Sequence, residues 1–234
     1  MGRSLRGAPT MSDDTLPSLP GLPSHALDQS ADLADACAAR TGQWLEAAIN
    51  PRSFDARLFA KLIAAREVRG EWALLGLSPA QWSGLVGRHF KSAPVTPDLT
   101  GLSRFSGATA TAAVAAMTVD THEHVEFAAA MRALMLRYAS PAVLLDDAQC
   151  LATIIAHACL RPDHLWRDLG LAGRDEVSAM LERYFPSLAA LNVENLRWKK
   201  FLAQQLALSL GREPGPAPGC PGCEDYGFCF PRAP

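Results

Sequence analysis

Apolar residues recur at helical spacing through most of the middle of this chain. The spacing predicts helices that follow Ser30, Ser53 and Ser78 and then cover about 121–138, 141–160, 174–184 and 193–210. Ser78-Pro79 is a typical helix start, because serine caps the free amides and proline fits the first turn. Strand-like alternation and internal repeats are absent, so the sequence predicts an all-α protein.

The two ends of the chain have a different composition from the middle. Ten of the 17 prolines lie in residues 1–25 or 214–234. We therefore expect a disordered arm over residues 1–28, a single helical domain over residues 29–211, and an irregular tail over residues 212–234 that is rich in Pro, Gly and Cys. Within the domain, residues 91–119 are a connection rich in Pro, Gly, Ser and Thr.

Bulk properties exclude several classes of function. A net charge of -2 provides no overall basic field for nucleic acid. No apolar run approaches the roughly 20 residues that span a bilayer, and the N-terminus lacks an apolar signal core. We therefore expect a cytoplasmic protein with neither nucleic acid nor membrane as a partner. The sequence has no phosphate-binding loop, nucleophile elbow or zinc-protease helix, which favours a role other than catalysis.

Three of the six cysteines lie within ten residues of one another in the tail, as Cys220, Cys223 and Cys229. The Pro-Gly pair between the first two predicts a type II turn, with a positive φ at Gly222. Such a turn brings its end residues within about 7 Å, so both thiols can face one centre. The remaining cysteines, Cys37, Cys150 and Cys159, are expected to pack in the core.

Three kinds of site are compatible with this cysteine spacing. A redox pair would use Cys220 and Cys223, but such pairs normally lie at a helix start in a βαβ unit, which the pattern does not predict. Structural zinc normally takes four ligands, and only three are local. A cuboidal iron–sulfur cluster binds one thiolate per iron, so three thiolates leave one corner open. Spacing alone does not decide between zinc and iron–sulfur.

Four ordered motifs resemble the NifQ family over about residues 120–231. They are "HLWRDLGL" (164–171), "FPSLAALN" (185–192), "LRWKKF" (196–201) and "APGCPGCEDYGFCF" (217–230). The resemblance implies a carrier that holds a cuboidal iron–sulfur cluster and supplies molybdenum for assembly of the nitrogenase iron–molybdenum cofactor. It also implies partners: the nitrogenase iron protein, the cofactor scaffold, and molybdate or another molybdenum donor. A zinc-stabilised helical interaction module without a redox metal is the alternative.

The family motif also suggests the residues of the site. Its cysteine pattern, C-x4-C-x2-C-x5-C, matches Cys220, Cys223 and Cys229, whereas its first cysteine falls on Gly215. His164 in the first motif is a candidate for a further metal ligand, although a capping or core-edge histidine has the same sequence signature.

The basic residues Arg197, Lys199 and Lys200 are candidate cofactor-binding residues, since cations attract both molybdate and an anionic cluster. The same residues also fit the solvated face of a half-buried helix, with Asp168 as an ion-pair partner for Arg197 or Lys200. In the metal-loaded state we expect the tail to lie against the 193–210 helix or the 161–171 loop.

Overall fold

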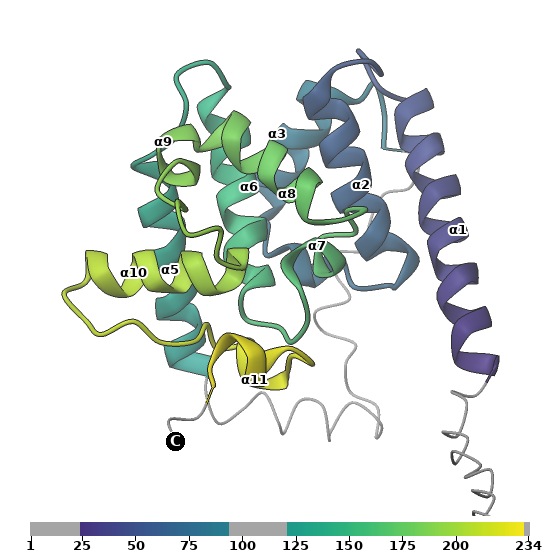
Figure 1. Ribbon diagram of the computed structural model, residues 1–234. Coiled ribbons are helices and arrows are strands. Elements are labelled where there is room, and N and C mark those ends of the chain that lie inside the picture. The colour runs from purple at the N-terminus through teal and green to yellow at the C-terminus, as the bar shows by residue number, and fades with distance from the viewer. Residues whose placement is uncertain (1–23, 94–120, 232–234) are drawn as a thin grey trace, which may run out of the picture.

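The computed structural model describes residues 24–93 and 121–231, and its regular elements there are helical (Figure 1). An isolated antiparallel bridge joins Ala48 to Phe90. The all-α prediction is confirmed. The elements up to the cysteine tail are α1 (Ser24–Glu46), α2 (Phe54–Val68), η1 (Trp72–Leu75), α3 (Pro79–His89), α5 (Thr121–Leu136), α6 (Leu145–Ala158), α7 (Leu165–Asp168), α8 (Arg174–Tyr184), α9 (Pro186–Ala189) and α10 (Trp198–Ser209).

Local capping explains why two of the predicted helix starts are confirmed. Ser53 accepts a hydrogen bond from the amide of Ala56 at 3.1 Å, at the start of α2. Ser78 forms a capping box with Gln81, in which each side chain accepts the other residue's backbone N–H. These bonds satisfy amides that have no partner inside the helix.

Other boundaries differ from the prediction. The helix α1 begins at Ser24, so residues 24–28 belong to a helix and not to the arm. Residues 1–23, and 94–119 of the predicted connection, lie outside the described residues. Ser140 accepts from the amide of Ala142 in a local turn, and α6 starts only at Leu145.

The start of α10 is also later than predicted. The Asn192 side chain accepts from the amide of Leu196 at 2.8 Å and donates to the Leu196 carbonyl at 2.9 Å, so it closes a loop just before the helix. The loop includes Asn195 at a φ of 52°. Because these bonds fix the chain in a non-helical conformation, α10 begins at Trp198 and not near residue 193.

The core is built around α2 and α6. The helix α1 lies along α2, α5 lies along α6, and α3 and η1 pack against α6. Its largest fully buried side chains include Trp44, Phe59, Phe90, Tyr184 and Phe201. Within the described residues, none of the helices combines the length and the apolar character needed to cross a membrane.

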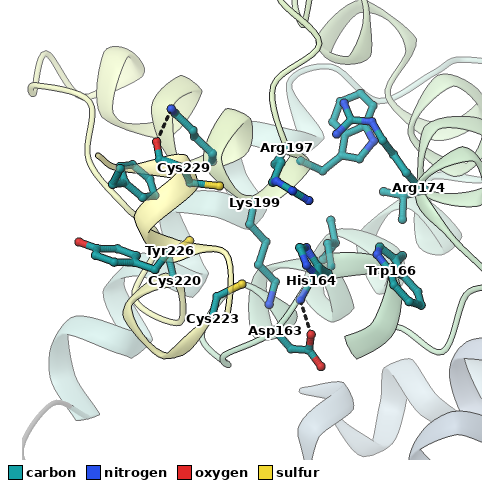
Figure 2. A pocket seen from close by; sticks show the side chains of 15 residues that line it. Asp163, His164, Trp166, Arg174, Arg197, Lys199, Cys220, Cys223, Tyr226 and Cys229 are labelled. Atoms are coloured by element: carbon teal, nitrogen blue, oxygen red, sulfur yellow. Dashed lines mark hydrogen bonds between the residues drawn. The ribbon is translucent and has the colours of Figure 1, made fainter. Parts of the chain in front are cut away.

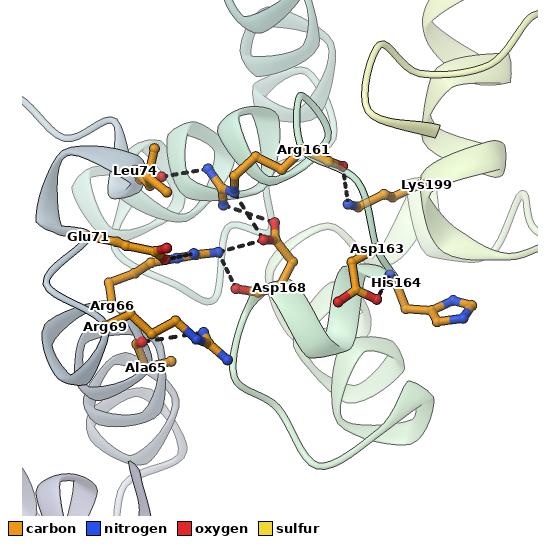
Figure 3. Close-up of polar contacts among 10 residues, drawn as sticks. All are labelled: Ala65, Arg66, Arg69, Glu71, Leu74, Arg161, Asp163, His164, Asp168 and Lys199. Atoms are coloured by element: carbon orange, nitrogen blue, oxygen red, sulfur yellow. Dashed lines mark hydrogen bonds and ion pairs between the residues drawn. The ribbon is translucent and has the colours of Figure 1, made fainter. Parts of the chain in front are cut away.

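A buried ionic network joins the N-terminal helices to the segment that precedes the site (Figure 3). The carboxylate of Asp168 accepts from Arg66 at 2.7 Å and from two nitrogens of Arg161 at 3.0 and 2.9 Å. Arg161 also donates to the carbonyl of Leu74 in η1, and Arg66 pairs with Glu71. The expectation that Asp168 pairs with Arg197 or Lys200 is therefore wrong, because tertiary packing brings α2 to it instead.

Candidate metal site

The cysteine tail lies against the helical body. After α10 the chain turns back, forms the single turn η3 (Cys220–Gly222), and ends the described part with α11 (Tyr226–Cys229). Figure 1 shows this yellow segment next to α10. It contacts both the residues around 161–164 and α10.

The Cys220-Pro221-Gly222-Cys223 turn is not of type II. The amide of Cys223 donates to the carbonyl of Cys220 at 2.9 Å within a 3-10 turn, and Gly222 is not among the residues with positive φ. Glycine is needed here for space. A Cβ at position 222 would lie 2.8 Å from the Cβ of Pro162. The close approach to Pro162 sets the glycine requirement, and a sequence motif does not show such a contact.

Gly219 provides a second close contact between the tail and the body. Its amide donates to the carbonyl of Cys159 at 3.1 Å. A Cβ on this residue would lie 1.9 Å from the carbonyl oxygen of Arg161. Its φ of -79° is open to any residue, so only the proximity of the Arg161 backbone requires glycine.

Gly219→Ala is expected to displace the tail from the body. Overpacking against backbone costs ~1–3 kcal/mol, which corresponds to roughly 5- to 150-fold greater opening of the tail. Maleimide labelling of the metal-free protein should then modify the buried Cys220 faster by that factor. Gly215→Ala is the matched control, because a Cβ at position 215 meets nothing within 4 Å. Equal labelling rates in the two variants would contradict this account of Gly219.

One pocket of about 80 Å³ brings together every site residue singled out from the sequence (Figure 2). The thiol-bearing residues Cys220, Cys223 and Cys229 line it from the tail. The remaining candidates line it from the body: His164, Arg197, Lys199 and Lys200. Arg174 at the start of α8 also lines the pocket. Sequence reasoning missed it because it lies just outside the 164–171 motif, and only its contacts with residues 195–198 show that it faces the pocket.

The cations around the thiols oppose the effect of burial on thiol ionisation. Burial raises the pKa of Cys220, and the positive charge of Lys199 acts in the opposite direction. Burial likewise raises the pKa of Cys229, against Arg197 and Lys200. Because the thiolate is the form that binds metal, these cations favour the binding form.

The cysteines outside the tail do not line this pocket. Cys150 and Cys159 are buried in the core, as expected, whereas Cys37 is half-buried. Burial raises the pKa of Cys159 to about 12, so its thiol stays protonated near neutral pH. Its backbone carbonyl nevertheless supports the tail by accepting from Gly219.

The two lysines of α10 have different surroundings. Lys199 is buried, with 6% of its surface exposed, and its ammonium donates to the carbonyl of Arg161 at 2.9 Å. No carboxylate in residues 24–93 and 121–231 lies within ion-pair distance of it. Lys200 donates to the carbonyl of Cys229 at 2.6 Å and lies over the Phe230 ring. Lys199 therefore provides an uncompensated buried charge, while Lys200 fixes the position of the last cysteine.

Ion pairs hold the loop between Cys223 and Cys229 to the body. Asp225 Oδ2 lies 2.6 Å from Arg197 Nη2 and 3.1 Å from His164 Nε2. Glu224 Oε1 lies 3.1 Å from Arg167 Nη2 and 3.4 Å from His164 Nε2. The imidazole of His164 therefore faces the two carboxylates of the tail.

The three tail thiols line one pocket without converging on a single point. Among the described residues, no three His, Cys, Asp or Glu side chains converge on a point where one metal ion could be held. The three thiols instead surround a common pocket.

These features define an all-helical protein whose C-terminal loop and α10 form a thiol-lined, cation-rich pocket. The chain belongs to the NifQ family, because the NifQ family model matches residues 56–231. The match begins upstream of the four sequence motifs and includes most of α2, whose Arg66 pairs with Asp168.

Curated relatives agree with the family. The chain is 45% identical over 103 residues to a "Protein NifQ homolog" of Sinorhizobium fredii, an alignment that covers 44% of each chain. It is 46% identical over 80 residues to "Protein NifQ" of Azotobacter vinelandii, covering 34% of this chain and 41% of the relative. For "Protein NifQ" of Klebsiella pneumoniae the identity is 41% over 86 residues, covering 36% and 52%. The alignments thus span about half the length of these relatives or less. No solved structure matches the chain.

Proposed function

We propose that this protein carries an iron–sulfur cluster together with molybdenum and supplies molybdenum for assembly of the nitrogenase iron–molybdenum cofactor. Membership of the NifQ family supports this role. The role implies the nitrogenase iron protein, the cofactor scaffold and a molybdenum donor as partners. It also implies action in the cytoplasm, where free thiols remain reduced.

The observation that carries the proposal is a buried cation without a counter-ion beside three thiols. Lys199 is 6% exposed, and no carboxylate of the described residues pairs with it. Burying an ammonium is costly unless an opposite charge compensates it. An iron–sulfur cluster with thiolate ligands is anionic, so its presence in this pocket would stabilise Lys199 as well as the cluster.

The residues then have separate roles. Cys220, Cys223 and Cys229 each bind one iron, and the corner without a protein thiolate is the position at which a cuboidal cluster can exchange a metal. Lys199 compensates charge from beneath the tail, and Lys200 holds the carbonyl of Cys229. His164 is the candidate for a further ligand. Its Nε2 atom must first leave Asp225 and Glu224.

Metal analysis of anaerobically prepared protein tests the proposal. Iron, acid-labile sulfide, molybdenum and zinc are quantified together, and electron paramagnetic resonance reports the type of cluster. Iron and sulfide in near-equal amounts, with molybdenum after incubation with molybdate, are expected. A colourless protein that holds zinc alone would instead identify the zinc-stabilised interaction module.

Gly215→Cys should slow the loss of iron to a chelator, because it restores the first cysteine of the family pattern. Position 215 is half-buried and a Cβ there meets open space, so the melting temperature of the metal-free protein should not change. Gly215→Ser is the matched control, since it adds a similar side chain without a thiol. If only Gly215→Cys holds iron and the parent chain holds none, three thiolates do not suffice.

A further inference from the structure

Arg197 has a polar atom that the fold leaves without a partner. Its Nε is buried, and among the described residues it is the one buried side-chain nitrogen or oxygen atom with no hydrogen-bond partner. Its Nη2 atom pairs with Asp225 at 2.6 Å, and its guanidinium lies over the ring of Phe228. Native proteins rarely leave a buried donor unsatisfied, so the Nε requires an explanation.

A second arginine lies on the same side of the pocket. Arg174 stacks over the Trp198 ring, and its Nη2 donates to the carbonyls of Asn195 and Leu196 and to the Asn195 side chain. None of these acceptors carries a charge. Burial lowers the pKa of Arg174, and the nearby charge of Arg197 lowers it further. Two guanidinium groups thus repel each other across a pocket that both of them line.

The pocket therefore has two chemically different sides. In Figure 2 the cysteines lie at the left, Arg174 lies at the right, and Arg197 lies between them. Sulfur donors characterise the first side and N–H donors the second. A ligand that satisfies the second side must be anionic and must offer several acceptor oxygens, because the planar guanidinium donates two parallel hydrogen bonds.

The tail itself supplies one such anion. The Asp225 carboxylate reaches Arg197 and His164 from the loop between Cys223 and Cys229, and its side chain is 31% exposed. It shows that an anionic oxygen is accommodated at this position. It does not reach the Nε of Arg197, so the carboxylate satisfies only part of the guanidinium.

We propose that the guanidinium side of the pocket, formed by Arg197 and Arg174, is a binding subsite for a tetrahedral oxyanion, and that Asp225 is its internal competitor. The inference rests on the proposed function in one respect: molybdate is the tetrahedral oxyanion that a molybdenum carrier would receive. Binding there places the oxyanion next to the thiols without using them as ligands. The subsite is therefore testable in metal-free protein.

The experiment is isothermal titration calorimetry of the metal-free, reduced full-length protein with sodium molybdate, and separately with sodium sulfate. One saturable site for molybdate is expected, with sulfate competing for it. Arg197→Gln should weaken molybdate binding by about tenfold or more, since it removes a charge-assisted pair of hydrogen bonds. Arg197→Lys keeps the positive charge but cannot donate two parallel hydrogen bonds from one planar group. The affinity of this variant for molybdate should therefore fall between those of the parent and Arg197→Gln.

Asp225→Asn separates competition from a merely structural role. If Asp225 competes with the oxyanion, the Asn variant should bind molybdate more tightly than the parent. If the pair with Arg197 only holds the loop in place, both Arg197→Gln and Asp225→Asn should weaken binding. That second result would overturn the inference, as would an absence of saturable binding of either anion to the parent.

Two further measurements keep this inference distinguishable from the proposed function. The double variant Cys223→Ser/Cys229→Ser should bind molybdate as the parent does, and a complete loss of binding would show that the thiols form the site. Circular dichroism confirms that each variant is folded. Iron quantification then tests the cluster alone: if the parent binds molybdate but never iron, the carrier proposal fails while the subsite stands.

Discussion

Replacing Cys220, Cys223 or Cys229 by alanine, one at a time, is expected to abolish iron binding. In the proposed cluster each thiolate is the ligand of one iron, and two remaining protein thiolates could not secure a cuboidal core. The loss should be nearly complete in each variant and not graded along the series. Iron and sulfide quantification after anaerobic reconstitution measures it, with circular dichroism of the metal-free variants to show that the helices persist.

The matched controls are the cysteines that do not line the pocket. Cys37→Ala, Cys150→Ala and Cys159→Ala should retain iron, with modest losses of packing stability at the two buried positions. Cys159→Ala is the most informative of them, because its carbonyl accepts from the amide of Gly219 beneath the tail. Loss of iron in that variant alone would mean that Cys159 completes the site.

Asp168→Asn should destabilise the protein by ~3–5 kcal/mol, because it removes the carboxylate that pairs with Arg161 and leaves the buried Arg66 with Glu71 alone. The carboxylate is 7% exposed and accepts hydrogen bonds from both arginines. Urea denaturation followed by circular dichroism measures the free energy of unfolding. The substitution keeps the shape of the side chain, so the loss reports on charge and not on a cavity.

The control for Asp168→Asn is an ion pair of the same kind at the surface. Lys61 pairs with Glu176, and both side chains are more than a third exposed. Glu176→Gln should cost ~0–1 kcal/mol, as exposed pairs usually do. Equal effects of the two substitutions would show that the Asp168 network contributes no more than a surface contact.

Local signals made much of the fold predictable. Serine caps locate the starts of α2 and α3, and the apolar spacing gives α5 and α8 within two residues. The starts of α6 and α10 were misplaced because a serine–proline turn resembles a cap and because the Asn192 loop carries no apolar pattern. Such boundaries depend on hydrogen bonds that only a folded loop makes.

At the site, too, local motifs were predictable and contacts made only by the folded chain were not. The thiols and the basic residues of α10 are predictable because short motifs contain them. The pairing of Arg66 with Asp168 is not, because it depends on packing between segments 102 residues apart. The place of Arg174 at the pocket is not predictable either, because it depends on contacts with residues 195–198. The prediction of a type II turn was also wrong. Gly222 leaves space for Pro162 and does not adopt a positive φ.

The Asp168 network sets a lower limit on the length of chain that can act independently. All four sequence motifs and all three tail cysteines lie after residue 160, which suggests a compact C-terminal fragment as an expression target. A fragment that begins at Thr121 would lack Arg66 and the Leu74 carbonyl, and would leave Asp168 and Arg161 without these partners. Since the Arg161 backbone contacts both Gly219 and Lys199, truncation upstream would loosen the very loop that carries the thiols. The smallest fragment that retains these contacts therefore includes α2 and η1. These elements lie more than 140 residues before the tail cysteines.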